Sequence, residues 1–369
     1  MLFKGTKSRS AIQIAKDLDK IGGFSNAFTG KEQTCFHARV LEKDLQFLTD
    51  LFSEIITDSI FDEREMELEK SVVLQEISMV EDTPDEYVQV LFDQDFWKGN
   101  PLGSPILGTR ETVNRITRKV MTESVSRFYS PSRLLVSAAG NVDHDVLVGY
   151  LRPFFDFIIN SDNAASVRHA PLPEPSVTCY PKDLEQTHIC LGAKASSLSG
   201  EERFAESIFN SILGGNMSSR LFQEIREERG LAYSVYSYGS SYIDTGLIRI
   251  YLAVDRKKIN MVLDLIGAII RKIQDGDLSE SDLTRAKDCL TGGILLGSES
   301  VDNLMMRLAK NEIVFGKYIG YDETIEKIGR VTLKEAIDAS KRVFSPDNIS
   351  LTILGPVDEN QITENPLNF

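Results

Sequence analysis

The chain has 369 residues, and 42% of them are hydrophobic, so it is long and apolar enough to bury the cores of two or three domains. Its formal net charge of −14, with no compensating stripe of Lys and Arg, makes nucleic-acid binding unfavourable because the phosphates would be repelled. No apolar run approaches the ~20 residues that a membrane span needs. The four cysteines are widely spaced, which indicates reduced thiols in a cytoplasmic protein rather than a disulfide framework.

In chain order, the first part of the sequence predicts strands at 23–28, 34–40 and 134–139, with helices at 45–57 and 62–81. The later part predicts strands at 188–193, 232–238, 245–254 and 350–354. Helices are expected there at 201–213, 259–273 and 279–296. Because strands and helices alternate along the chain, a sheet with helices packed on it is favoured.

The sequence repeats itself at a nearly constant separation. Residues 128–143 match residues 343–358 in a Ser-Pro pair, a glycine and a Val-Asp pair, with an offset of 343 − 128 = 215. A second match, Ala38-Arg-Val40 against Leu252-Ala-Val254, has an offset of 254 − 40 = 214, and the charged helices that follow are offset by 275 − 58 = 217. Three matches in the same order are typical of a tandem duplication.

These observations predict an α+β fold built by tandem duplication of a two-layer α/β domain, with a mixed or antiparallel sheet and helices on one face. We expect an N-terminal domain at 1–159 and a C-terminal domain at 184–369, joined by an extended, proline-containing linker at 160–183. The second copy starts with a strand and a helix whose counterparts would precede Met1. We therefore expect the natural chain to begin upstream of Met1, and the first copy to lack its first strand and helix.

Several segments resemble the inverted-zincin family of metallopeptidases, to which insulinase and the mitochondrial processing peptidase belong. They are Met1-Leu-Phe-Lys-Gly-Thr6, Gly22-Gly-Phe-Ser-Asn-Ala-Phe-Thr29, Val72-Val-Leu-Gln-Glu-Ile77, Pro101-Leu-Gly-Ser-Pro-Ile-Leu-Gly-Thr109, and Ser219-Arg-Leu-Phe-Gln-Glu-Ile-Arg226 with Gly230-Leu-Ala-Tyr-Ser-Val235. The resemblance implies a zinc metalloendopeptidase whose two halves form a clam-like chamber around an extended peptide.

In that family a His-x-x-Glu-His helix supplies two zinc ligands and the general base, and it runs directly into a stretch like Met1–Thr6. All three residues would precede Met1. The histidines of this chain, which we interpret as strand, loop or linker residues, are not followed by Glu-His at that spacing; they are His37, His144, His169 and His188. Zn²⁺ is therefore expected only when the upstream motif is present, and the 369-residue chain itself is expected to be inactive.

By the same resemblance, Glu76 is the third zinc ligand. Glu69 lies seven residues earlier, on the same helix face, and is implied to be the carboxylate that orients a histidine ligand. Without the resemblance, both would be read as members of an acidic, solvated helix face. The offset of 217 places Ala286 and Gly293 opposite them in the second copy, which therefore lacks the zinc ligands. Ser211 and Gly215 take the places of the missing histidines.

The second copy is instead implied to hold substrate. Arg226 and Tyr233 match residues that bind the carbonyl oxygen of the scissile region and stabilise the oxyanion. Asn26 and Ala27 match the edge strand to which the peptide substrate adds as a further strand. The stretch 214–219 lacks the lysine of a phosphate-binding loop, and a turn between helices is expected there.

Three functions are thus open. The first is a zinc metalloendopeptidase; the second is a non-catalytic subunit or pseudo-peptidase that binds peptides or a catalytic partner; the third, ranked last, is a structural scaffold. The expected partners are a peptide substrate and, in a homodimer or heterodimer, a second member of the family. Neither nucleic acid nor a membrane span is expected.

Overall fold

The computed structural model describes residues 1–156 and 169–357, which form two compact units. Unit 1 holds Met1–Met79, the chain from Ile106 to the first gap, and Ser300–Lys310. Unit 2 holds Val80–Pro105, the chain from that gap to Glu299, and the chain from Asn311 onward. Each unit therefore includes a short segment that lies, in sequence, within the span of the other.

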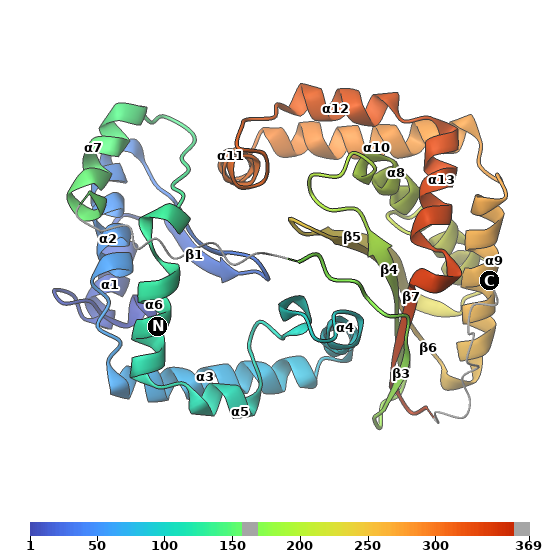
Figure 1. Cartoon of the computed structure of the whole chain (residues 1–369), viewed down its shortest axis with the longest axis horizontal. Coiled ribbons are helices and arrows are strands. Elements are labelled where there is room, and N and C mark those ends of the chain that lie inside the picture. The colour runs from blue at the N-terminus through green and yellow to red at the C-terminus, as the bar shows by residue number, and fades with distance from the viewer. Residues whose placement is uncertain (157–168, 358–369) are drawn as a thin grey trace. The chain divides into compact units, whose positions relative to one another are not determined.

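Unit 1 combines helices with a two-stranded sheet (Figure 1). Strands β1 (Phe24–Thr29) and β2 (Thr34–Arg39) lie where the sequence predicted strands, and they pair antiparallel. The helices are α1 (Ala11–Lys20), α2 (Leu45–Thr57), α3 (Glu63–Glu81, which runs into unit 2), α5 (Arg110–Arg115), α6 (Arg118–Phe128) and α7 (His144–Phe155). Single 3-10 turns lie at Leu2–Lys4, Glu42–Asp44 and Pro131–Arg133. The core is small and consists of Leu2, Ile14, Leu51, Ile55 and Phe61.

The expected strand at 134–139 is wrong, because these residues pair with no strand of the described chain. Its counterpart in unit 2 is β7, which is hydrogen-bonded on both sides, to β3 and to β4. The described residues of unit 1 contain no counterpart of either neighbour, and a strand without partners cannot form a ladder. Ser137 instead donates a side-chain hydrogen bond of 2.8 Å to the Met305 carbonyl oxygen in the α11 segment of unit 1.

Unit 2 is built on a five-stranded mixed sheet in the order β3-β7-β4-β6-β5. β3 and β7 are parallel and the other pairs antiparallel. The strands are β3 (Val177–Pro181), β4 (Thr187–Ala195), β5 (Ala232–Ser241), β6 (Gly246–Val254) and β7 (Ile349–Gly355). β3 falls in the last part of the segment expected to be a linker, whose residues up to 168 lie outside the described chain.

One face of this sheet is covered by three helices that the sequence predicted and by one that it did not. The predicted helices are α8 (Arg203–Leu213), α9 (Ile259–Gln274) and α10 (Glu280–Ser298). The fourth is α13 (Leu333–Val343), and a further helix, α12 (Tyr321–Arg330), packs on α10. α11 (Val301–Phe315) begins in unit 1 and ends in unit 2. Single 3-10 turns lie at Pro101–Gly103, Arg256–Lys258 and Pro346–Asn348. This layer forms the larger of the apolar cores.

The opposite face of the sheet is covered by α4 (Pro84–Phe96), which the sequence did not place there. Val88, Phe92 and Phe96 of this helix, with Trp97 after it, pack on a sheet surface formed by Cys190, Leu247, Tyr251, Ala253 and Leu354. Because both faces are covered, all nine residues of β6 are buried. Helices therefore flank the sheet of unit 2 on both sides, rather than on one face alone.

The order of elements in the two halves is consistent with duplication. α6 and α13 both have 11 residues and are offset by 333 − 118 = 215. α3 and α10 both have 19 residues and are offset by 280 − 63 = 217. Each long helix follows an antiparallel strand pair and a shorter helix. The halves can therefore be compared position by position.

The position of α4 over the sheet determines how readily the Cys190 thiol should react. Cys190 is fully buried beneath α4, and burial raises the pKa of its thiol to about 12, so it carries almost no thiolate at about pH 8. Iodoacetamide should label exposed Cys289 in the native protein within minutes and leave Cys190 unmodified, as read by peptide mass spectrometry. Both should react in concentrated urea, and rapid native labelling of Cys190 would show that α4 does not cover this face.

Candidate functional site

The acidic helix α3 lies against the start of the chain. Glu69 Oε2 is 3.0 Å from Lys4 Nζ, and Glu69 Oε1 is 3.9 Å from the amino nitrogen of Met1. Glu76 lies two helical turns further along α3 on the same face; it is exposed and has no ionic or hydrogen-bond partner among the described residues. The structure thus places the first residues of the chain beside the face that carries both carboxylates.

The start of the chain is itself held firmly. Thr6 and Ser8 donate side-chain hydrogen bonds to the Glu54 carboxylate of α2, and Arg9 forms a 3.0 Å ion pair with Asp17 of α1. Leu2 is buried in the core of unit 1. Residues Met1–Lys4, at the start of the Met-Leu-Phe-Lys-Gly-Thr stretch, therefore form a fixed platform beside Glu69 of α3.

The contacts recorded for the histidines of the described chain involve residues other than Glu69 and Glu76. His37, on β2, packs between the rings of Phe24 and Phe28, and His144 is the first residue of α7 rather than a loop residue. His188, on β4, has its Nδ1 2.9 Å from the Tyr251 hydroxyl, and burial lowers the pKa of its imidazole. His169 follows the gap in the described chain.

Zinc needs three protein ligands and an open position for water. Within the described ranges, no three His, Cys, Asp or Glu side chains come together in a group that could hold a metal. Glu76 has the chemistry of one ligand and Glu69 that of a supporting carboxylate, but the histidine ligands have no candidates among these residues. The described residues by themselves do not fit a zinc site.

In unit 2, Arg226 and Tyr233 lie together at the surface. Arg226 belongs to a π-helix, Phe222–Glu227, and its guanidinium carbon is 4.9 Å from the centroid of the Tyr233 ring and 4.7 Å from that of Phe222. Tyr233 is 79% exposed and lies on β5 where the register with β6 shifts. π-helical turns and β-bulges re-aim side chains and are frequent at functional sites. Neither irregularity, nor the stacking role of Phe222, has a signal in the sequence.

Asn26 and Ala27 lie on β1, which has β2 on one side and no strand on the other among the described residues. The side-chain oxygen of Asn26 accepts a 2.8 Å hydrogen bond from the Ala27 N–H. Phe24 and Phe28 on the same strand are exposed. The strand thus offers an open edge, although the Ala27 N–H already has a partner.

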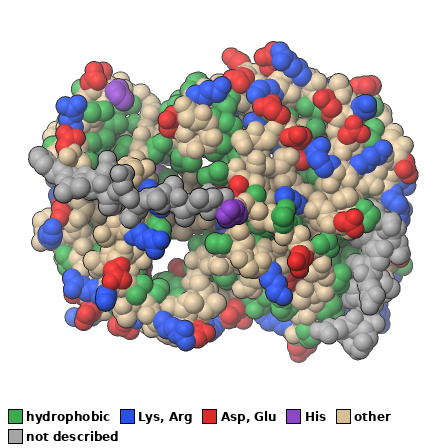
Figure 2. All heavy atoms as spheres, viewed as in Figure 1, with side chains coloured by type: hydrophobic (Ala, Val, Ile, Leu, Met, Phe, Trp, Pro, Cys, Tyr) green, Lys and Arg blue, Asp and Glu red, His purple; other side chains and the backbone are tan. Residues whose placement is uncertain are grey.

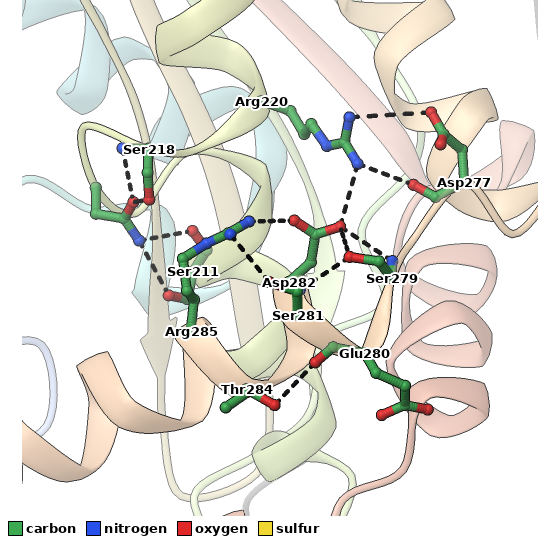
Figure 3. Close-up of polar contacts among 11 residues, drawn as sticks. Ser211, Ser218, Arg220, Asp277, Ser279, Glu280, Ser281, Asp282, Thr284 and Arg285 are labelled. Atoms are coloured by element: carbon green, nitrogen blue, oxygen red, sulfur yellow. Dashed lines mark hydrogen bonds and ion pairs between the residues drawn. The ribbon is translucent and has the colours of Figure 1, made fainter.

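A polar pocket of about 480 Å³ in unit 2 is a weaker candidate site. Its lining consists of Ser218, Arg220, Gln223, Glu224, Glu228, Arg229, Lys272, Asp282 and Arg285. Figure 3 shows Arg220 and Arg285 both turned toward Asp282, which also closes the N-terminal capping box of α10 with Ser279. Burial alone would raise the pKa of Asp282, but its hydrogen bonds from Ser279 and the two guanidinium groups lower it. The charges are internally paired, so this cluster serves to fix the start of α10.

The surface carries no basic stripe on the face shown in Figure 2, where Lys and Arg side chains are interspersed with Asp and Glu. No helix of the described chain is both long and apolar enough to cross a membrane.

Residues 1–110 match the family model described as insulinase (peptidase family M16), and residues 115–290 match the peptidase M16 inactive domain. An uncharacterized zinc protease of Mycobacterium leprae is 37% identical over 360 residues, covering 96% of this chain and 81% of that protein. The uncharacterized zinc protease YmxG of Bacillus subtilis is 35% identical over 356 residues, covering 96% of this chain and 86% of its own.

The fold recurs in a protease from Helicobacter pylori, with a TM-score of 0.88 at 19% identity, covering 96% of this chain and 87% of that one. It also recurs in a peptidase M16 inactive domain from Pseudomonas fluorescens, with a TM-score of 0.85 at 18% identity, covering 97% of this chain and 86% of that one. Fold and sequence together define a metallopeptidase-type α+β protein. The chain belongs to peptidase family M16, the insulinase family.

Proposed function

We propose that the protein is a zinc metalloendopeptidase of the processing-peptidase and insulinase type, which cleaves extended peptides held by strand addition. In this proposal Glu76 is the zinc-binding carboxylate and Glu69 its supporting acid. The proposal further requires two histidine ligands and a general-base glutamate, as in the His-x-x-Glu-His motif of the family. The single observation that carries the proposal is the position of Glu69 and Glu76 on one face of α3, beside the Met1–Lys4 platform.

The second half of the chain supports this arrangement. There α8 packs against α10, and Ala286, the counterpart of Glu69, is buried in the core that these helices share. Ser211 lies on α8 and Gly215 follows it, at the positions that correspond to the two histidines. A helix placed on α3 as α8 is placed on α10 would face Glu69 and Glu76, and it would lead into Met1.

Arg226 and Tyr233 are proposed to bind the carbonyl oxygen of the peptide bond that is cleaved. A guanidinium and a phenol both donate hydrogen bonds, and both groups lie at the surface here. Their donors would stabilise the negative charge that develops on this oxygen. β1, with Asn26 and Ala27, is proposed to pair with the backbone of the substrate, which would make binding depend little on substrate sequence.

The oxyanion role predicts a specific kinetic loss. In the active, upstream-extended protein, Tyr233→Phe and Arg226→Met should each lower kcat for peptide cleavage by about 100-fold, the usual loss for one oxyanion donor. Because both side chains are surface groups, the melting temperature should change little. Tyr236→Phe, which alters a neighbouring tyrosine on β5, is the matched control and should retain activity. Unchanged kcat in both variants would remove these residues from the site.

The alternative function is a non-catalytic subunit or pseudo-peptidase, favoured by the absence of a metal-binding group among the described residues. It would bind peptides or a catalytic partner of the same family, in a heterodimer or, with a second copy, a homodimer. Sequencing the DNA upstream of the Met1 codon separates the two. An in-frame His-x-x-Glu-His abutting Met1 supports the peptidase, and a stop codon supports the subunit. The four free cysteines support a reducing, cytoplasmic compartment for either.

A further inference from the structure

A strained residue stands immediately before the helix that carries Glu69 and Glu76. Phe61 has a φ of 47°, which makes it the one non-glycine residue of the described chain in the left-handed region. Bulky side chains disfavour this conformation, because the Cβ approaches the following carbonyl group. Such strain persists only where the surroundings impose it, and it is concentrated at functional positions.

Two sets of interactions impose this conformation. Arg118, at the start of α6, donates hydrogen bonds to the Ile60 carbonyl oxygen from Nη2 (3.0 Å) and Nε (3.2 Å), and to the Phe61 carbonyl oxygen from Nε (3.1 Å). The Phe61 ring is buried with Leu2 and Ile55 in the core of unit 1. The guanidinium therefore holds both carbonyl groups of the turn while the core holds its side chain.

The turn connects the start of the chain to α3. Ile60 donates its N–H to the Gly5 carbonyl oxygen (3.2 Å), and Ser59 donates its hydroxyl to that of Leu2 (3.1 Å). Asp62, directly after Phe61, accepts from the N–H groups of Arg64 and Glu65, both at 3.0 Å, and so caps α3. The direction in which α3 leaves the Met1–Lys4 platform is thus set at Phe61.

The second half of the described chain has no equivalent of the strained turn at Phe61. The counterpart of Phe61 is Leu278, since 278 − 217 = 61, and its φ is not positive. The turn before α10 uses Gly276 instead, with a φ of 95° that glycine adopts without strain. The counterpart of Arg118 is Leu333, since 333 − 118 = 215, which has no such donor. The strained turn occurs in the half that carries the carboxylates and is missing from the half that has Ala286 and Gly293.

We propose that Arg118 is a positioning residue: by holding the Phe61 turn it fixes the direction of α3, and with it the places of Glu69 and Glu76 relative to the start of the chain. The importance of this role for zinc binding rests on the proposed function. The effect of Arg118 on the position of α3 does not depend on that function, and this effect can be measured on the 369-residue chain without metal.

Zero-length crosslinking with a water-soluble carbodiimide tests the proposal. The reagent activates a carboxylate, which then forms an amide with an amine already in contact, so the yield of the Lys4–Glu69 product reports the 3.0 Å pair. The local pair within α3, between Lys70 and Glu67 at 2.8 Å, is the internal standard. In Arg118→Met, the Lys4–Glu69 yield should fall about tenfold relative to that standard, because reaction within a pre-formed contact is steeply sensitive to placement.

Arg115→Met is the matched control, since Arg115 lies three residues away, is exposed, and pairs with Glu111. It should leave the ratio unchanged. Arg118→Lys, which retains one donor group, should give an intermediate ratio and keeps the test valid if the methionine variant fails to fold. A wild-type ratio in a folded Arg118→Met or Arg118→Lys protein overturns the proposal. If the crosslink is lost in Arg118→Met but the wild-type protein extended upstream fails to bind zinc, the positioning role stands and only the peptidase assignment is refuted.

Discussion

Glu76→Gln should abolish zinc binding in a form of the protein extended upstream to include the histidine motif. Glutamine keeps the size of the side chain but removes the charge, and a neutral amide oxygen is a poor replacement for a carboxylate on Zn²⁺. The loss of affinity should exceed the about 10–100-fold that removal of a supporting carboxylate costs. Glu69→Gln should fall within that smaller range. Metal content after dialysis and chelator-sensitive cleavage of an unstructured peptide are the measurements.

Glu67→Gln is the matched control, because Glu67 is an exposed glutamate on the same helix that pairs only locally, with Lys70. It should retain full zinc occupancy and activity. The unextended 369-residue chain should bind no stoichiometric zinc, because one carboxylate without its partner ligands is not a site. Full occupancy in Glu76→Gln would remove this residue from the ligand set, and stoichiometric zinc in the unextended chain would refute the upstream location of the histidines.

Arg249→Met should destabilise unit 2 by about 3–5 kcal/mol, the usual cost of leaving one member of a buried ion pair without its partner. Arg249 lies on β6 with its side chain almost fully buried, and it forms an ion pair with Asp93 of α4. Burial alone would lower the pKa of this guanidinium, but the facing Asp93 carboxylate raises it, so the guanidinium stays charged. Without the arginine, the Asp93 carboxylate of α4 stays buried after losing this ion pair.

Urea unfolding followed by tryptophan fluorescence measures this effect directly. The chain has one tryptophan, Trp97, which is 1% exposed and belongs to the α4 cluster. The double variant Arg249→Met with Asp93→Leu should recover most of the loss, because no unpaired charge remains. Arg330→Met, which removes an exposed pair with Glu326, should change stability by less than about 1 kcal/mol. An equally mild effect of Arg249→Met would mean that the pair contributes nothing to docking α4.

Much of the fold could be predicted from the sequence, because periodicity records which face of an element is buried. The predicted ranges of α2, α3, α8, α9 and α10 and of the strands β1, β2, β4, β5, β6 and β7 are confirmed to within a few residues. The prediction of a strand at 134–139 was wrong because an apolar pattern does not indicate whether neighbouring strands are present, and the described part of unit 1 has none for this segment. The helix α4 and its position were not predicted, for a related reason: apolar residues such as Val88 and Phe92 indicate a buried element, but they do not indicate against which sheet it packs.

For the candidate site, the sequence supplied residue identities and the structure supplied their surroundings. Glu69, Glu76, Arg226 and Tyr233 were singled out by resemblance, and their roles stay predictions. The contact of Arg226 with Tyr233 depends on a π-helix and a β-bulge, and the orientation of α3 depends on a left-handed phenylalanine. Each is a local departure from ideal geometry that long-range packing imposes, so propensity and spacing could not reveal it.

Each unit includes a segment that lies, in sequence, within the other unit, and this arrangement affects how the chain folds while it is being synthesised. α4 is made early, yet the strands it covers emerge much later, β4 beginning 187 − 84 = 103 residues after α4 begins and β7 ending 355 − 96 = 259 residues after it ends. Until β7 is complete, the apolar side of α4 has no finished surface to pack on, and the hairpin of unit 1 waits for Ser300–Lys310. Contacts between such distant positions slow folding and prolong the exposure of apolar surface. The nascent chain therefore cannot finish one half before beginning the other, and the apolar side of α4 lacks its complete partner surface until β7 has left the ribosome.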